Sequence, residues 1–262
     1  MQLSERQDPI RKKFFDLIEK IDKISIRLFF LCGLLSVSAA YLGDTNLRSF
    51  VPILQGIFLT ASLCLFGLDL WVKLSLSPNA ADARSTDFMA SAFNQPLCST
   101  RTSGYYNNAV GPGMQRIAAQ VFENTFFTKE ICYGMLRVEV PIAIIYLVFW
   151  IGALVLGGLS ISIVGVLAQV LFSEQVGARI LRLFWLSRKC ESIHETMRTL
   201  FLSRATGDYF NAAALNSFTR YEVSKAIAGI TLSSKVFDKL NQDLSLQWIN
   251  LSQECGVPQN QM

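Results

Sequence analysis

The stretch VPIAIIYLVFWIGALVLGGLSISIVGVLAQVLFS, residues 140–173, contains no Asp, Glu, Lys, Arg or His at any of its thirty-four positions. A helix crosses the ~30 Å hydrocarbon core of a bilayer with roughly 20 apolar residues, so this run is too long for one straight crossing. Gly157 and Gly158 lie near its middle, and glycine weakens a helix but fits a tight turn. The stretch therefore predicts a hairpin of two short transmembrane helices that turns at this glycine pair.

Two more apolar stretches precede this hairpin. Residues 28–43 carry no charge, and residues 50–72 carry only Asp69. Pro52 falls in the first turn of the second stretch, where its missing amide donor does no harm. The residues between the two stretches are too few for anything except a turn. We therefore expect a first transmembrane hairpin over residues 28–73.

The overall composition agrees with a membrane protein. Hydrophobic residues make up 51% of the chain and charged residues only 17%, and the mean hydropathy is +0.35, whereas soluble domains carry about 25% charged residues. Four spans leave too little scattered polar sequence for a large enzyme core. The six cysteines show no CxxC spacing, which favours reduced thiols over disulfides or a metal site.

The distribution of Lys and Arg predicts the orientation in the membrane. Residues 1–27 carry seven, residues 43–50 one, residues 73–139 six, the glycine turn at 157–158 none, and residues 174–262 ten. Basic residues next to membrane spans mark the cytoplasmic side. We therefore expect both termini and the central segment on the cytoplasmic side of the membrane. Because this placement explains the net charge of +4, direct nucleic-acid binding is not expected.

The polar segments outside the spans are helical in pattern, except for one. Apolar residues at three- and four-residue steps predict an amphipathic helix within residues 1–27, and another from Met114 through Tyr133 and Arg137 into the third span. Residues 75–113 are rich in Ser, Asn, Ala, Pro and Gly and predict a loop with short helical pieces. Beyond the fourth span, Gly207-Asp208 and Thr231–Ser234 divide the sequence into three predicted cytosolic helices.

The predicted fold class is an all-α membrane protein with four transmembrane helices in two hairpins, a cytosolic central segment and a small helical C-terminal bundle. The chain then divides into an amphipathic helix (1–27), a first hairpin (28–73), a central segment (74–139), a second hairpin (140–176), a helical bundle (177–251) and a frayed tail (252–262).

Five polar residues inside the spans are candidates for a functional path, because polar groups in lipid usually face protein or water. They are Gln55, Thr60, Ser62, Asp69 and Gln169. One interpretation is hydrogen bonding between helices, and the small residues Gly56 and Thr60 would let helices approach closely. The other is a water-filled path, which would need several copies of the chain because four helices cannot enclose a pore.

Conventional catalytic motifs are missing from the sequence. His194 is the sole histidine, and it lies four residues after Cys190 with Glu191 and Glu195 beside it. This spacing departs from HExxH, so we interpret it as a solvated helix face and expect no metal or cofactor. No P-loop, GxGxxG or GxSxG motif is present. A membrane-bound enzyme remains an alternative, and its catalytic residues would have to include His194, Glu191 or Glu195. The sequence favours a protein that is not an enzyme.

One run in the central segment resembles a known family. It comprises Tyr105-Tyr106-Asn107-Asn108, then Arg116, then the seven residues from Glu123-Asn124 to Lys129, just before the third span. It resembles the cytosolic segment of bacterial four-helix membrane effectors, encoded in antiphage operons beside cyclic-nucleotide synthases, and retron-paired membrane proteins look similar. The plain alternative is that the Tyr and Phe pairs only pack the central helix.

The resemblance implies a function. Such effectors permeabilise the inner membrane when a cytosolic sensor, activator protein or small second messenger reports infection, and the infected cell dies. It also implies a homo-oligomer, and it makes Tyr105, Tyr106, Arg116, Glu123, Asn124 and Lys129 a candidate coupling segment. The alternative function is a non-catalytic membrane component of a secretion, conjugation or regulatory apparatus.

Overall fold

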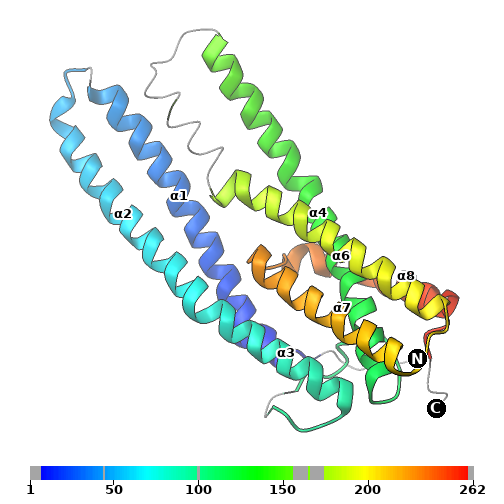
Figure 1. The fold of residues 1–262 in the computed structure, drawn as a ribbon. Coiled ribbons are helices and arrows are strands. Elements are labelled where there is room, and N and C mark those ends of the chain that lie inside the picture. The colour runs from blue at the N-terminus through cyan, green and yellow to red at the C-terminus, as the bar shows by residue number, and fades with distance from the viewer. Residues whose placement is uncertain (1–6, 44, 99–100, 156–164, 166–173, 259–262) are drawn as a thin grey trace. The chain divides into compact units, whose positions relative to one another are not determined.

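The fold is seen in a computed structural model that describes residues 7–43, 45–98, 101–155, 165 and 174–258. Within those residues the protein is all-α and forms six continuous helices (Figure 1). The contacts divide the chain into two compact units. The first, here called the helical unit, comprises residues 1–16, 78–136 and 182–262. The second, here called the apolar unit, comprises residues 17–77 and 137–181.

Three helical stretches are long and apolar enough to cross a membrane. They are Arg11–Gly43, Arg48–Phe93 and Met114–Gly152, whose most apolar windows have mean hydropathies of 1.8, 1.9 and 1.8. Only 6%, 6% and 11% of those windows is buried inside the protein. Apolar surface of this extent is covered by lipid in membrane proteins. The structure therefore indicates a multi-pass membrane protein.

The structure has two helices where the sequence predicts the first hairpin. Helix α1 (Asp16–Gly43) ends at the residue where the uncharged run ends, and α2 (Val51–Trp71) begins with Pro52 in its first turn. A 3₁₀ turn (Arg48–Phe50) leads into α2. The two helices lie side by side (Figure 1), and Cys32 Sγ of α1 is 3.6 Å from Ser62 Oγ of α2. Of the amphipathic helix predicted within residues 1–27, the part from Pro9 onward is observed, and it is continuous with α1 through a π-helical turn at Arg11–Phe15. Residues 1–6 lie outside the described residues.

The predicted helix that begins at Met114 is also confirmed. Helix α4 (Met114–Val155) runs for 42 residues with Pro141 inside it. It passes from the helical unit into the apolar unit between Leu136 and Arg137. The predicted turn at Gly157-Gly158 and most of the predicted fourth span lie outside the described residues.

The predicted loop over residues 75–113 is wrong for its first half. Helix α3 (Ser77–Phe93) occupies this region and continues α2 through a π-helical turn at Val72–Leu76. Its buried face consists of Ala80, Asp87, Phe88, Ala90 and Ala92. Alanine is the best helix former, and it allows close packing without a large apolar side chain. The helix therefore lacks the bulky periodic residues by which an amphipathic helix is usually identified.

The helical unit is built around the first half of α4. Ile117, Ala118, Ala119, Val121 and Phe122 are all 0% exposed, so this part of the helix is covered on every side. The surrounding helices are α6 (Arg179–Leu202), α7 (Gly207–Ala228) and α8 (Ser234–Glu254). They correspond to the three helices that the sequence predicts beyond the fourth span, and α7 and α8 begin at the predicted breaks.

The ends of these helices follow ordinary capping rules. The side chain of Ser233 accepts a hydrogen bond from the backbone N–H of Val236 at the start of α8. Gly229 ends α7 with a left-handed φ of 56°, a conformation that suits glycine.

The predicted frayed tail is wrong for residues 252–258. Ser252, Cys255 and Val257 are only 1%, 3% and 4% exposed. Gly256 has a left-handed φ of 67°, and the N–H of Val257 donates to the carbonyl of Ser252 at 2.9 Å. This turn after α8 brings the chain back against the core. The segment is therefore packed, although its composition is polar.

Candidate functional site

A loop comprising residues 101–110, here called the central loop, is held by two buried carboxylates. Asp87 of α3, 2% exposed, accepts hydrogen bonds from the backbone N–H of Thr102 at 3.0 Å and from its hydroxyl at 2.6 Å. Glu123 of α4, 3% exposed, accepts from the N–H and the amide of Asn107 at 2.7 and 2.9 Å, and from the amide of Asn108 at 2.7 Å. Hydrogen bonds to a charged acceptor are about twice as strong as neutral ones.

Arg84 of α3 ties the N-terminal residues to the same loop. Its Nη2 donates to both carboxylate oxygens of Asp8, at 2.8 and 3.2 Å, and its guanidinium lies 4.6 Å from the ring centroid of Tyr105. Burial alone would lower the pKa of Arg84, but Tyr105 and Asp8 outweigh it and raise the pKa. Gln7 and Ser103 also exchange two backbone hydrogen bonds of 3.0 Å. The central loop thus links α3, α4 and the segment that leads into α1.

The other predicted coupling residues contact the same region, with one exception. Arg116 donates to the carbonyls of Val110 at 2.6 Å and Ser91 at 2.9 Å. Tyr106 hydrogen-bonds Asn124, and burial raises the pKa of Tyr106. The exception is Lys129, whose ammonium lies 3.5 Å from Glu130 and over the ring of Phe126. The structure therefore brings five of the six predicted residues to one polar site, which is partly buried and has Glu123 at its buried side.

The predicted in-membrane polar residues do not form one group. Gln55, Ser62 and Asp69 are seven apart and share one face of α2. Ser62 lies against Cys32, and Asp69 forms an ion pair of 3.0 Å with Lys73 one turn later. Gln55 is exposed, and Gln169 lies outside the described residues.

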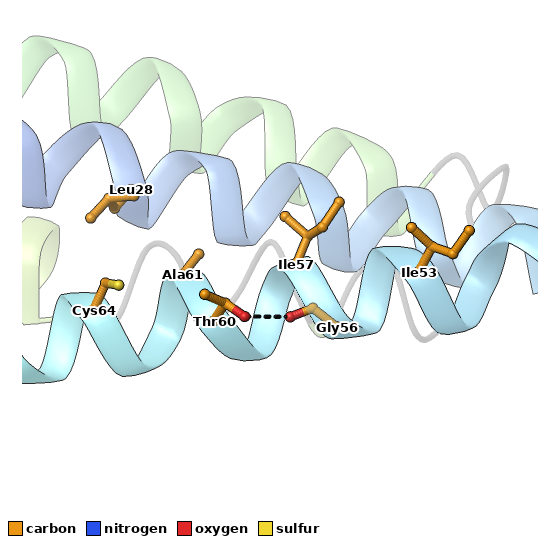
Figure 2. A pocket seen from close by; sticks show the side chains of 7 residues that line it. All are labelled: Leu28, Ile53, Gly56, Ile57, Thr60, Ala61 and Cys64. Atoms are coloured by element: carbon orange, nitrogen blue, oxygen red, sulfur yellow. Dashed lines mark hydrogen bonds between the residues drawn. The ribbon is translucent and has the colours of Figure 1, made fainter.

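Thr60 lies on a different face of α2. Its hydroxyl donates to the carbonyl of Gly56 at 2.9 Å, as Figure 2 shows. Both residues line a shallow apolar hollow with Leu28 of α1 and with Ile53, Ile57, Ala61 and Cys64 of α2. The hydroxyl of Thr60 thus has its hydrogen-bond partner within its own helix. The face of α2 that carries Gln55, Ser62 and Asp69 remains the candidate for a water-filled path.

The prediction of a solvated face around His194 is wrong. His194 is 4% exposed and Cys190 is 0% exposed. The imidazole centroid lies 4.7 Å from the ring centroid of Phe122, and burial together with Lys129 lowers the pKa of His194 to about 4. Glu195 is exposed. The sequence carried a usable signal, because His194 falls in step with the other buried positions of α6, which include Leu183, Leu186, Cys190, Met197 and Leu200.

Among the described residues, no group of three or more His, Cys, Asp or Glu side chains could hold a metal ion. The sequence matches no protein-family model, and no curated protein or solved structure is significantly similar to it.

Proposed function

We propose that the protein is an inner-membrane effector of a bacterial antiphage system that assembles and permeabilises the membrane when triggered from the cytoplasm. The observation that carries the proposal is the continuity of α4. This one helix holds Glu123, which anchors the central loop, and also the apolar residues that enter the membrane at its far end. A change at the central loop therefore acts directly on a transmembrane segment.

The proposal also includes a topology in the membrane. Four spans in two hairpins, with both termini in the cytoplasm, follow from the charge-free run at residues 140–173 and from the placement of basic residues. The turns on the outer side are then very short. A trigger has almost no surface to bind there, so it acts on the cytosolic side.

The central loop suits a switch because two buried carboxylates are among its main anchors. Asp87 and Glu123 together accept five hydrogen bonds from it, two and three respectively. A sensor protein, an activator or a small second messenger that binds the loop in its released form would shift the balance toward release. Moving a two-state equilibrium from 1:99 to 99:1 takes about 5.5 kcal/mol of differential binding.

The polar face of α2 supports a conducting assembly. Gln55, Ser62 and Asp69 lie in line on an otherwise apolar helix, and such residues in membrane spans usually face water or protein. Several copies that turn this face inward would enclose a polar path, which a single chain has no room to do.

The test is the membrane potential of cells that produce the protein. Over-production, or co-expression with an activating partner, is expected to depolarise cells within minutes, while chromosomal DNA and bulk nucleotide pools are initially unchanged. A potential-sensitive dye reports the change. Growth arrest with a fully maintained potential would refute the proposal and favour a component of a secretion, conjugation or regulatory apparatus.

A further inference from the structure

The outward face of α7 differs from those of its neighbours in the helical unit. The exposed charged residues of α6 include Arg188, Lys189, Glu195 and Arg198. Those of α8 are Lys235, Asp238, Lys239, Asp243 and Glu254. Along the whole of α7, by contrast, the one charged residue that is fully exposed is Asp208, in its first turn.

Beyond its first turn, the exposed face of α7 is instead uncharged and mainly apolar, with Asn216 and Thr219 as its polar residues. Tyr209, Leu215, Val223 and Ile227 are 73%, 44%, 49% and 64% exposed. The opposite face of α7, which includes Phe210, Ala214, Tyr221 and Ala228, already packs in the core of the helical unit. The helix is therefore apolar on two sides, although its own unit covers only one. A helix that is apolar all round is normally buried on both sides.

Five exposed residues of this face are arranged symmetrically about Thr219. From Thr219 outward, Leu215 and Val223 lie four residues away on either side, and Ala212 and Ala226 lie seven residues away. The pattern is therefore alanine, large aliphatic, threonine, large aliphatic, alanine. A helix with such a face matches a second, antiparallel copy of itself, as a two-fold symmetric interface requires.

We propose that this face of α7 binds α7 of a second copy of the chain, antiparallel, with Thr219 at the two-fold axis. Leu215 then packs against Val223 of the other copy, and the alanines at the two ends allow close approach. No like charges meet in the stripe. The charged residues at its edges are engaged within their own unit: Lys225 forms an ion pair of 2.7 Å with Glu222, and Arg220 donates to Ser192 at 3.3 Å.

The chemistry of the stripe argues against other occupants. Nucleic acid or an anionic lipid surface would require exposed Lys or Arg, and no basic residue on this helix is fully exposed. A single helix pair buries less than the roughly 1,200–2,000 Å² of a stable soluble interface. Copies anchored in one membrane, however, meet at a high effective concentration, so a weak contact is sufficient. The inference deepens the proposed function, which requires several copies.

The first test is disulfide cross-linking of the full chain in membrane vesicles. The background carries Cys64→Ser and Cys98→Ser, which remove the two cysteines that are not buried. A disulfide needs Cα atoms within about 7 Å, so Thr219→Cys is expected to give a covalent dimer because its thiol meets its own symmetry mate. The matched control is Gln242→Cys, an exposed position on α8, which is expected to give none.

The second test introduces two opposite charges that can form an ion pair only between two copies of the chain. Leu215→Lys or Val223→Glu alone is expected to lower the rate of Thr219→Cys cross-linking about tenfold or more. The double variant is expected to restore it, since each introduced lysine faces an introduced glutamate in the antiparallel register. Within one chain these positions are eight residues apart and cannot pair. Circular dichroism of each variant checks that the helices remain folded.

Two results would overturn the inference. One is the absence of the Thr219→Cys dimer. The other is a dimer whose yield is unaffected by Leu215→Lys, which would place the contact elsewhere. If the introduced thiol is instead shielded from a water-soluble maleimide only when lipid is present, the face lies on the membrane. Depolarisation without cross-linking refutes this inference alone, and cross-linking without depolarisation refutes the proposed function alone.

Discussion

The two units of the chain place their large apolar side chains in opposite ways. In the helical unit the large apolar side chains are internal, and Phe122 is 0% exposed with the ring centroids of His194, Trp248 and Phe201 between 4.7 and 5.8 Å away. In the apolar unit the large side chains face outward, as for Ile145 at 70% and Phe149 at 64%. Water drives the first arrangement, and lipid permits the second. The same residue type should therefore contribute differently to stability in each unit.

The largest expected difference comes from removing one aromatic ring in each unit. Phe122→Ala is expected to destabilise the helical unit by about 3–5 kcal/mol, because it leaves a cavity among packed rings. Phe149→Ala, the matched control in the apolar unit, is expected to change stability by less than about 1 kcal/mol, since lipid fills the space. Thermal unfolding of detergent-purified protein, followed by circular dichroism and by proteolysis of each unit, measures both. Equal effects would remove the distinction between the units.

The next effect is a pH dependence of the helical unit. The ordinary pKa of histidine is about 6.5, whereas in the folded protein the pKa of His194 is lowered to about 4. Protonation therefore favours the unfolded chain, so stability is full above pH 6.5 and is lost as the pH falls from 6.5 toward 4. The loss from this one group reaches about 3 kcal/mol.

The control for this prediction is His194→Phe, which keeps an aromatic ring beside Phe122 and Phe126 but cannot be protonated. The variant is expected to show a flatter stability profile between pH 6.5 and 4, measured by chemical denaturation. A profile as steep as that of the unaltered protein would assign the acid sensitivity to other groups.

A smaller effect is expected at the central loop. Glu123→Gln keeps the shape of the side chain but replaces one carboxylate oxygen with an NH2 group. That NH2 group would face the side-chain NH2 of Asn107 or Asn108, so two donors would meet. The mismatch is expected to lower stability by about 2 kcal/mol and to expose residues 101–110 to proteases. Glu195→Gln, on an exposed helix face, is the control and should leave proteolysis unchanged. If both variants were cleaved at the same rate, Glu123 would not hold the loop.

Much of the fold follows from local patterns in the sequence. The uncharged run that ends at Gly43, Pro52 in the first turn of α2, and the breaks before Gly207 and Ser234 all mark real helix ends. Each of these signals acts within a few residues. The placement of His194 could also have been predicted, since its spacing from Cys190 and Met197 matches the buried period of α6.

The remaining features depend on contacts that are distant in sequence. Helix α3 is recognisable only when its alanines are seen packed, and the central loop is fixed by partners 15 and 16 residues away for Asp87 and Glu123. The link between Asp8 and Arg84 spans 76 residues. No local pattern encodes such pairs, so the residues of the candidate site could be named from the sequence while their arrangement could not.

The smallest expected change in stability occurs at Asp69 of the apolar unit, and for that reason it gives the cleanest functional probe. Its ion pair with Lys73 is half-exposed and lies within one helix, so it contributes below about 1 kcal/mol. Asp69→Leu should therefore leave the amount of protein in the membrane unchanged. If the face shared by Gln55, Ser62 and Asp69 lines a wet path, the substitution should nevertheless weaken depolarisation, because an apolar side chain replaces a charge next to water. Ile53→Ala, on the opposite and exposed side of α2, leaves that polar face intact and is the control, which should depolarise cells normally. Full depolarisation by Asp69→Leu at normal protein level would exclude this face from the path, and the polar residues of α2 would then serve only to pack helices.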